Sequence, residues 1–158
     1  MKKILIALDC TPTAQIIAET GFSLGKAMGA EVTLMHVIVD APYYSSAIND
    51  PIMGFAGYID TVFLGTAINE KLTNASKLFM NKTKLHLGDE SIKTLVTAGD
   101  FALSILEKAN EMKADIIVMG SHSKKWLEQI IMGSVTENVL RDTTIPLFIV
   151  PTKKQHSV

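Results

Sequence analysis

Short apolar runs along the chain alternate with longer segments in which apolar residues recur every three or four positions. An apolar run without polar alternation indicates a strand covered on both faces, whereas the longer period indicates an amphipathic helix. The runs predict strands at 4–8, 32–39, 92–97, 115–119 and 147–150. The longer segments predict helices at 14–28 and 68–87, a third that opens at Gly99-Asp100, and a fourth from 133 to 142. Strands that alternate with helices imply an α/β fold, in which a five-stranded parallel sheet is doubly wound with helices on both faces.

Cap and packing residues refine the first helix. Thr11 and Pro12 predict its N-cap and its first helical position. The residues Gly21, Gly25 and Gly29 are spaced four apart. This spacing favours close packing of the helix on the sheet, with Gly29 as its C-terminal cap.

Other positions mark the remaining boundaries. Asp100 predicts the N-cap of the third helix. Residues 40 to about 65 keep no sustained period, so we expect a surface excursion there, because the stretch is too long for an ordinary connection. Pro146 and Pro151 enclose the last strand, Leu147–Val150. Since proline has no N–H to donate, this arrangement favours a strand at the edge of the sheet.

Length and composition narrow the class of protein. The 158 residues predict a single domain over 1–152 with a polar tail at 153–158. The chain has 15 Lys and Arg against 16 Asp and Glu, so it lacks the overall basic excess of a typical nucleic-acid binder. No apolar run approaches the roughly 20 residues that a membrane span needs. A single cysteine, Cys10, cannot form an internal disulfide, which favours a reducing compartment, and we expect a cytoplasmic protein.

Several familiar catalytic and phosphate-binding motifs are absent. The chain contains no P-loop G-x-x-x-x-G-K-[ST], no G-x-G-x-x-G after the first strand and no nucleophile elbow G-x-S-x-G. In a doubly wound sheet, ligands bind outside the carboxyl ends of the strands, where the strand order reverses. The candidate segments are therefore those that follow the strands, namely 9–12, 37–40, 97–100 and 120–123.

Two glycine-containing segments are candidates for a phosphate cradle. Gly120-Ser-His-Ser123 follows a predicted strand, and Gly133-Ser134-Val135-Thr136 opens a predicted helix nine residues later. The first amides of a helix have no intrahelical partner and attract anions, and the hydroxyls of Ser134 and Thr136 add donors. A capping box between Ser134 and Glu137 explains the same residues without any ligand. Local chemistry leaves both interpretations open.

The same segments carry a resemblance to a known family. The matching stretches are 4–9, 34–37, 114–122, 133–136, 139–140 and 146–151. With this set the chain resembles the universal stress protein family over about 150 residues, which implies a Rossmann-like, adenine nucleotide alpha hydrolase-like sheet. The nucleotide-binding branch of that family carries G-x-x-G, nine residues, then G-[ST]. Gly120, Gly133 and Ser134 match this pattern, while Ser123 stands in place of the second glycine. Ser123 has a steric cost if that position needs a positive φ, but supplies an amide if only an amide is needed.

The resemblance also implies an adenosine end to the site. Asp9 would accept from the ribose hydroxyls, and Val37 would read the adenine edge with its backbone. The complete set of implied nucleotide-binding residues is Ala7, Asp9, Val37, Met119, Gly120, His122, Ser123, Gly133, Ser134, Val135 and Thr136. From the residues alone, an Asp after a strand equally caps the next turn. His36 is expected to be a satisfied histidine at the edge of the core.

These observations lead to one leading expectation and two alternatives. We expect a cytoplasmic stress-response regulator that binds ATP or AMP, with Mg²⁺ held by phosphate oxygens and a hydroxyl such as Ser134. Pairing of the edge strand Leu147–Val150 with its copy would form a homodimer. No catalytic residues and no metal ligands are predicted, and ATP turnover would be slow at most. The alternatives are a dimeric interaction protein of the same fold without nucleotide, and an enzyme or electron carrier such as a flavoprotein or nucleotidyl transferase, which the missing catalytic groups disfavour.

Overall fold

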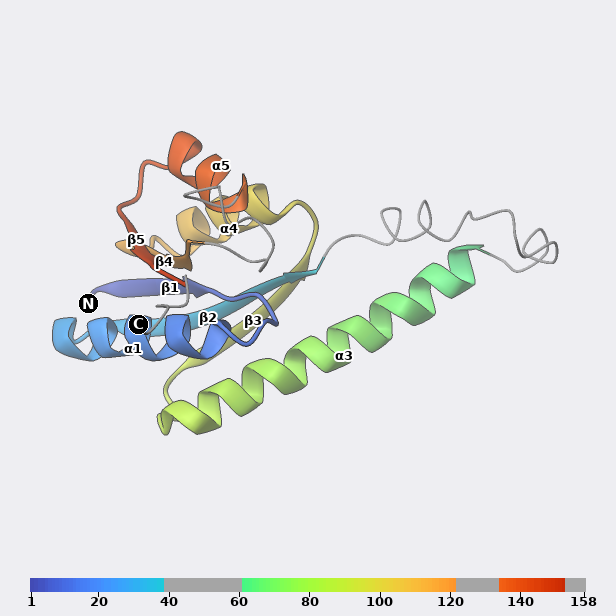
Figure 1. Cartoon of the computed structure of the whole chain (residues 1–158), viewed down its shortest axis with the longest axis horizontal. Coiled ribbons are helices and arrows are strands. Elements are labelled where there is room, and N and C mark those ends of the chain that lie inside the picture. The colour runs from blue at the N-terminus through green and yellow to red at the C-terminus, as the bar shows by residue number, and fades with distance from the viewer. Residues whose placement is uncertain (39–60, 122–133, 153–158) are drawn as a thin grey trace, which may run out of the picture.

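The computed structural model describes residues 1–38, 61–121 and 134–152. For residues 61–68 within this set, it describes the backbone but not the side chains. Strands and helices alternate along the described chain (Figure 1). In chain order the elements are β1 (Lys3–Ala7), α1 (Ala14–Met28), β2 (Glu31–Ile38), α3 (Thr61–Leu87), β3 (Lys93–Ala98), α4 (Phe101–Glu111), β4 (Ile116–Gly120), α5 (Ser134–Asp142) and β5 (Leu147–Val150).

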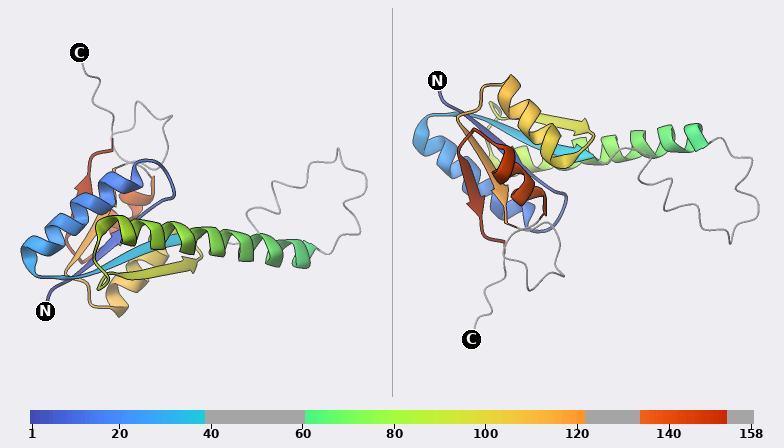
Figure 2. Two further views of the ribbon diagram at one scale, coloured as in Figure 1. Left: turned by 90° about the horizontal axis from the view of Figure 1, so that it is seen from below. Right: turned by 90° about the horizontal axis from the view of Figure 1, so that it is seen from above.

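The five strands form one parallel sheet in the order β3-β2-β1-β4-β5. β1 lies at the centre, paired with β2 from Lys3–Glu31 to Ala7–Met35 and with β4 from Ile4–Ile116 to Ile6–Val118. Helices α1 and α3 cover one face of the sheet and α4 and α5 the other (Figure 2). The predicted α/β class with a doubly wound parallel sheet is therefore confirmed, and β5 is an edge strand as its flanking prolines predict.

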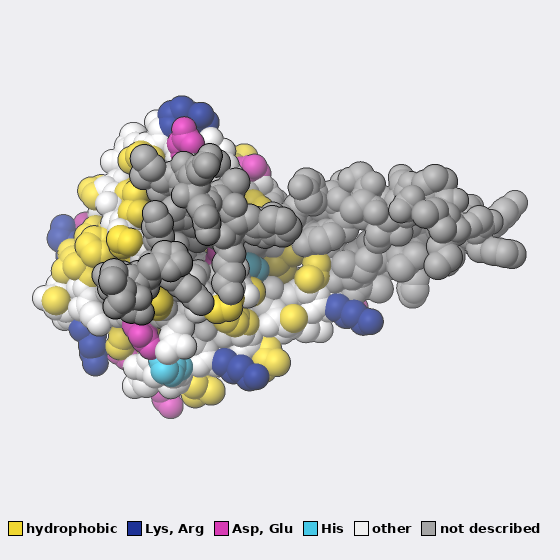
Figure 3. Space-filling model, viewed as in Figure 1, with side chains coloured by type: hydrophobic (Ala, Val, Ile, Leu, Met, Phe, Trp, Pro, Cys, Tyr) yellow, Lys and Arg dark blue, Asp and Glu magenta, His cyan; other side chains and the backbone are white. Residues whose placement is uncertain are grey.

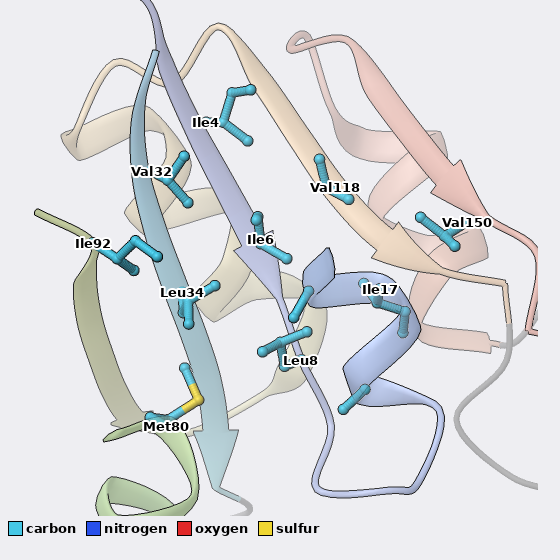
Figure 4. Packing of buried hydrophobic residues seen from close by; sticks show 12 residues of the cluster. Ile4, Ile6, Leu8, Ile17, Val32, Leu34, Met80, Ile92, Val118 and Val150 are labelled. Carbon is cyan, nitrogen blue, oxygen red and sulfur yellow. The ribbon is translucent and has the colours of Figure 1, made fainter. Parts of the chain in front are cut away.

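Two hydrophobic cores explain why the strands are apolar without interruption. On the α1 and α3 side, Ile4 and Ile6 of β1 pack with residues such as Met80 and Val118 (Figure 4). On the opposite side, the intervening Leu5 packs with the apolar faces of α4 and α5. Because successive strand residues point to opposite faces and both faces are covered, every position of the strand favours an apolar side chain.

The glycines of α1 allow this helix to approach the sheet closely. A Cβ atom on Gly25 would lie 2.5 Å from Val32 Cγ2, and one on Gly21 would lie 2.7 Å from Ile6 Cδ1. Gly29 ends the helix with a φ of 60°, and its N–H bonds the carbonyls of the last turn. The predicted packing role and C-cap are both confirmed.

One predicted N-cap and one predicted helix start are wrong, whereas the predicted bounds of α1, 14–28, are confirmed. The N-cap of α1 is Thr13, two residues after the predicted Thr11, because the Thr11 hydroxyl donates instead to Asp9. Helix α3 already begins at Thr61, so its first turns occupy the end of the predicted excursion. The predicted N-cap of α4 is confirmed, since the Asp100 carboxylate accepts from the Leu103 amide at 2.8 Å.

Helix α3 is much longer than the sheet that it covers. Its C-terminal half packs on β2 and β3, while its first turns run beyond the edge of the sheet (Figures 1 and 2). No helix within the described ranges has both the length and the apolar character that a membrane crossing requires. The rest of the predicted excursion, residues 40–60, and the predicted polar tail at 153–158 lie outside the described residues.

Candidate functional site

The strand order reverses between β1 and β4. From β1 the chain proceeds to β2 and β3 on one side, and β4 and β5 then add on the other side. This reversal defines the switch point at which ligands of doubly wound sheets bind. The predicted residues Ala7 and Asp9 lie at or just after the end of β1, and Met119 and Gly120 end the neighbouring β4. The structure therefore brings two of the predicted segments side by side.

Asp9 organises the turn between β1 and α1. Its Oδ1 accepts from the Thr11 hydroxyl at 2.6 Å and from the Thr11 amide at 3.4 Å, and Thr11 Oγ1 lies 2.8 Å from Thr13 Oγ1. The turn-capping interpretation of Asp9 is thus correct. Turn capping by Oδ1 is also compatible with ligand binding by Asp9. Its Oδ2 makes no hydrogen bond to a described residue, and the side chain is half-buried at the switch point.

His36 stops the ladder between β1 and β2. Its Nδ1–H donates to the Leu8 carbonyl at 2.8 Å, so the imidazole takes the position at which the next strand amide would bind. Nδ1 then carries the ring proton, which leaves Nε2 as the acceptor. The prediction that His36 is a satisfied near-core histidine is confirmed, but its part in ending the ladder was not visible in the sequence.

The end of this ladder exposes the backbone of Val37. The Met35 carbonyl accepts from Leu8 N on the β1 side, whereas the Ile38 carbonyl accepts from Gly99 N on the β3 side. Since backbone groups alternate sides along a strand, the amide and carbonyl of Val37 face the β1 side, past the last residue of β1. Within the described residues no backbone hydrogen bond fills that side of Val37. Its side chain is buried in the core, so only the backbone can contact a ligand.

Cys10 lies beside this opening. Its Sγ is 3.5 Å from Nε2 and 3.9 Å from Nδ1 of His36, so the sulfur sits over the ring rather than along one lone pair. Burial and the neighbouring Asp9 charge raise the pKa of the Cys10 thiol, and a hydrogen bond with Ser76 only partly offsets this. The thiol is therefore protonated at neutral pH, as expected of a small apolar side chain rather than an activated nucleophile.

The end of β4 is tied to the end of β5. The Ser121 amide donates to the Val150 carbonyl at 2.9 Å, and the Thr152 amide donates to Ser121 Oγ at 3.1 Å. A Cβ atom on Gly120 would lie 2.5 Å from Ile17 Cδ1 and 3.0 Å from Thr152 Cγ2. Close packing against Ile17 of α1 and against Thr152 thus favours glycine here, a reason that the sequence did not suggest.

Helix α5 presents its first amides toward the same edge of the sheet. The buried Thr136 donates its hydroxyl to the Gly120 carbonyl at 2.9 Å, so the start of α5 is held against the end of β4. This bond engages the Thr136 hydroxyl proton, and the expected contact of Thr136 with phosphate stays a prediction. Its amide and those of Ser134 and Val135 remain, since the first amides of a helix have no intrahelical partner.

The capping box, the alternative interpretation of this helix start, is not formed within the described residues. α5 begins at Ser134 itself, and no hydrogen bond joins Ser134 to Glu137 in this described segment. Ser134 is exposed, and Val135 packs its side chain against the core beneath α4 and α5. The predicted residues His122, Ser123 and Gly133 lie outside the described residues, so their placement stays a prediction.

The charged groups of the described chain form no metal centre. No group of three His, Cys, Asp or Glu side chains within residues 1–38, 61–121 and 134–152 lies close enough to hold a metal ion. An open groove of about 350 Å³ lies on the far side of the Thr11 turn, between α1 and α3. Its lining consists of Thr11, Pro12, Gln15, Ala18, Phe79, Lys82, Thr83 and His86. Of the predicted nucleotide-binding residues that the structure describes, none lines this groove.

Comparisons with known proteins agree with this architecture. The model of the Universal stress protein family matches residues 1–151. Universal stress protein MJ0577 of Methanocaldococcus jannaschii is 33% identical over 155 residues, covering 96% of each chain. A solved structure of MJ0577 has a TM-score of 0.76 at 30% identity and covers 98% of each chain.

Two further solved structures share the fold at lower identity. A universal stress protein in complex with cAMP has a TM-score of 0.63 at 16% identity, covering 96% of this chain and 98% of its own. A universal stress protein from Archaeoglobus fulgidus in complex with dAMP has a TM-score of 0.57 at 16% identity, covering 94% and 97%.

Proposed function

Since the chain belongs to the universal stress protein family, we propose that it is a stress-response regulator that binds an adenine nucleotide, ATP or AMP, at the switch point between β1 and β4. One observation carries the proposal. At a single edge of the sheet, the open backbone of Val37 and the open oxygen of Asp9 lie on one side of the switch point, and the first amides of α5 lie on the other. This arrangement provides groups for a base, a ribose and a phosphate in that order.

The chemistry of each group suits one part of the nucleotide. The amide and carbonyl of Val37 match the donor and acceptor pattern of an adenine edge. Asp9 Oδ2 accepts from the ribose hydroxyls while Oδ1 keeps the Thr11 turn. The amides of Ser134 and Val135 are at the positive end of the α5 dipole, which attracts phosphate. Similar proteins of this fold bind cAMP and dAMP, both of which carry adenine and phosphate.

The remaining predicted residues complete the proposed site. Gly120, His122, Ser123 and Gly133 contribute to the phosphate end, and Ala7 and Met119 line the floor between the base and the phosphates. In this proposal Mg²⁺ enters with ATP, held by phosphate oxygens and a hydroxyl such as that of Ser134. The protein acts in the cytoplasm as a homodimer joined through β5, and nucleotide occupancy sets its regulatory state.

The test asks whether purified protein carries or takes up a nucleotide. The protein is denatured and any released AMP, ATP or flavin is identified by chromatography. The melting temperature is then measured with and without Mg-ATP and AMP. A one-site ligand at about 100 times its Kd stabilises the folded state by roughly 2.7 kcal/mol, so the melting temperature should rise by several degrees.

A matched pair of variants makes the test specific. Asp89 forms the same kind of turn as Asp9, because its Oδ1 accepts from the amide and hydroxyl of Ser91 at 2.9 Å and 2.6 Å. Asp9→Ala should abolish the shift by nucleotide, whereas Asp89→Ala should retain it. If millimolar nucleotide produces no shift and none is released from the native protein, the interaction protein without nucleotide becomes the better explanation.

A further inference from the structure

The outer face of α3 has a pattern that the nucleotide site does not use. Lys71, Leu78 and Leu85 recur every seven residues, and positions seven apart lie on nearly the same side of a helix. The opposite side of α3 faces the sheet, where Ser76 and Met80 are buried. Leu78 and Leu85 are 57% and 76% exposed. The two leucines thus form an apolar seam that faces away from the protein's own core.

Lysines flank this seam on both sides. Lys77 and Lys84 lie along one flank, seven and fourteen residues after Glu70, and Lys82 lies along the other. From residue 70 to residue 87 the helix carries four lysines and one glutamate, a net of three positive charges, whereas the whole chain has a net charge of -1. None of these lysines forms an ion pair with a described residue. Basic and apolar side chains both reach the surface over α3 (Figure 3).

This charge pattern disfavours pairing of α3 with its own copy. Two such helices packed on their leucine seams would bring two surfaces of net charge +3 together in either orientation, which is repulsive. A helix with leucines on its seam and carboxylates on its flanks would bury Leu78 and Leu85 and pair with the lysines. We propose that the outer face of α3 docks an acidic amphipathic helix of a partner protein.

The shape of α3 suits such a partner better than a lipid surface. The helix is long, and its outer face from residue 70 to residue 87 gives a partner helix several turns to lie along (Figures 1 and 2). An interfacial membrane helix needs a broad apolar face with several large side chains. On the described part of α3, that face offers only two leucines, and Asn81 lies between them along the chain.

The experiment uses the full-length protein and a synthetic probe. The probe is a peptide of about three heptads with Leu at its seam positions and Glu at its flanking positions, and its basic twin carries Lys in place of Glu. Binding is measured by fluorescence anisotropy at low and high salt. We expect the acidic probe to bind, to weaken as salt increases, and to bind at least about tenfold more tightly than the basic twin.

Two variants locate the binding surface. Leu78→Ser with Leu85→Ser should abolish binding of the acidic probe, whereas Leu103→Ser on α4, where the leucine is also 57% exposed, should leave it unchanged. Lys77→Glu with Lys84→Glu should reverse the preference, so that the basic twin binds better than the acidic probe. Circular dichroism of all variants should match that of the parent, because every substituted side chain lies at the surface or on its margin.

Three outcomes would overturn the proposal. These are failure of the acidic probe to bind, equal binding of both probes, and persistence of binding in the leucine variant. Sedimentation with vesicles of phosphatidylglycerol and phosphatidylcholine provides the remaining comparison. If the protein instead sediments with these vesicles in a manner that depends on Leu78 and Leu85, and fails to bind the acidic probe, the surface binds lipid. In that case the proposal that it docks a partner helix is wrong.

Discussion

One imidazole decides where the ladder between β1 and β2 ends. By donating to the Leu8 carbonyl, His36 replaces a strand hydrogen bond and leaves the backbone of Val37 open. In the neighbouring Asp9, Oδ1 accepts hydrogen bonds from the Thr11 turn, and Oδ2 accepts none from a described residue. In the proposed nucleotide site, contact with the base and the sugar would therefore depend on two side chains, His36 and Asp9, whose hydrogen bonds within the described residues are structural.

The thiol of Cys10 gives a direct measure of the electrostatics at this opening. Burial and the Asp9 charge both disfavour the thiolate, so the pKa of Cys10 lies above its ordinary value of 9.0. Because the thiolate is the reacting form, labelling by an aromatic disulfide reagent should be slow at neutral pH, with a midpoint above pH 9. Asp9→Asn removes one of the two raising causes and should move the midpoint down.

The measurement is the labelling rate across pH for the parent and the variant. A midpoint at or below pH 9 in the parent, or an unchanged midpoint in Asp9→Asn, would contradict this description of the opening. Labelling of the protein unfolded in denaturant provides the reference for an unperturbed thiol.

At the scale of elements, packing between α1 and the sheet fixes the position of the Thr11 turn. Gly21 and Gly25 bring the helix close to β1 and β2, and Gly120 lets Ile17 of α1 contact the end of β4. Through this packing, the three glycines set the distance between the two sides of the switch point.

Gly25→Val tests this close approach. The new Cβ would lie 2.5 Å from Val32 Cγ2, and Val32 is a buried β-branched residue with little rotamer freedom. Overpacking of a core typically costs 1–3 kcal/mol, so we expect the free energy of unfolding to fall by about 2 kcal/mol. Urea unfolding measures the change, with Ser23→Val on the exposed side of the same helix as the control. Equal losses in both variants would show that helix propensity, not packing, is responsible.

How far the sequence predicts each element depends on the range of the interactions that form it. The strands are predicted to within about a residue at each end, because burial on both faces acts on every position. The N-cap of α1 is misplaced by the sequence pattern because the Thr11 hydroxyl bonds to Asp9 rather than capping the helix. The role of His36 depends on a contact with Leu8, distant in sequence, which no local pattern reports.

The candidate site likewise has parts that local sequence patterns predict and parts that depend on contacts between residues distant in sequence. The switch point follows from the alternation of strands and helices, so the sequence could predict its neighbourhood. The open backbone of Val37 was suggested only by family resemblance, since a backbone group has no residue-type signal. The hydroxyl of Thr136 was assigned to a ligand, but it bonds to Gly120 across the fold. The sequence pattern of a hydroxyl residue at a helix start is the same whether the hydroxyl contacts a ligand or bonds within the protein.

At the scale of the whole molecule, the sheet has one edge suited to self-association. β5 is an edge strand without charged residues, and Phe148 is 39% exposed on it. The other edge, β3, carries exposed Lys93 and Thr94, and lysine on an edge strand discourages pairing. This asymmetry supports the proposed dimer through β5.

Phe148→Lys should therefore shift the protein toward the monomer. A lysine at this position would place like charges close together across a two-fold interface, and we expect the dimer to dissociate at a concentration at least about tenfold higher than for the parent. Sedimentation velocity across a concentration series measures the change. Leu140→Lys on α5, an apolar residue that is 48% exposed, is the control and should leave the dimer intact. A parent that is monomeric throughout would eliminate this interface.

The hydrogen bonds at the end of β4 have a consequence for communication between copies. Thr136 fastens the first turn of α5 to Gly120, and the next residue, Ser121, is fastened to Val150 and Thr152 at the margin of the molecule. These hydrogen bonds link the first turn of α5 to β5 through two adjacent residues, Gly120 and Ser121. In a dimer joined through β5, a nucleotide that shifts α5 on binding would also shift the dimer interface. Binding of nucleotide to the two copies would then show positive or negative cooperativity rather than independence.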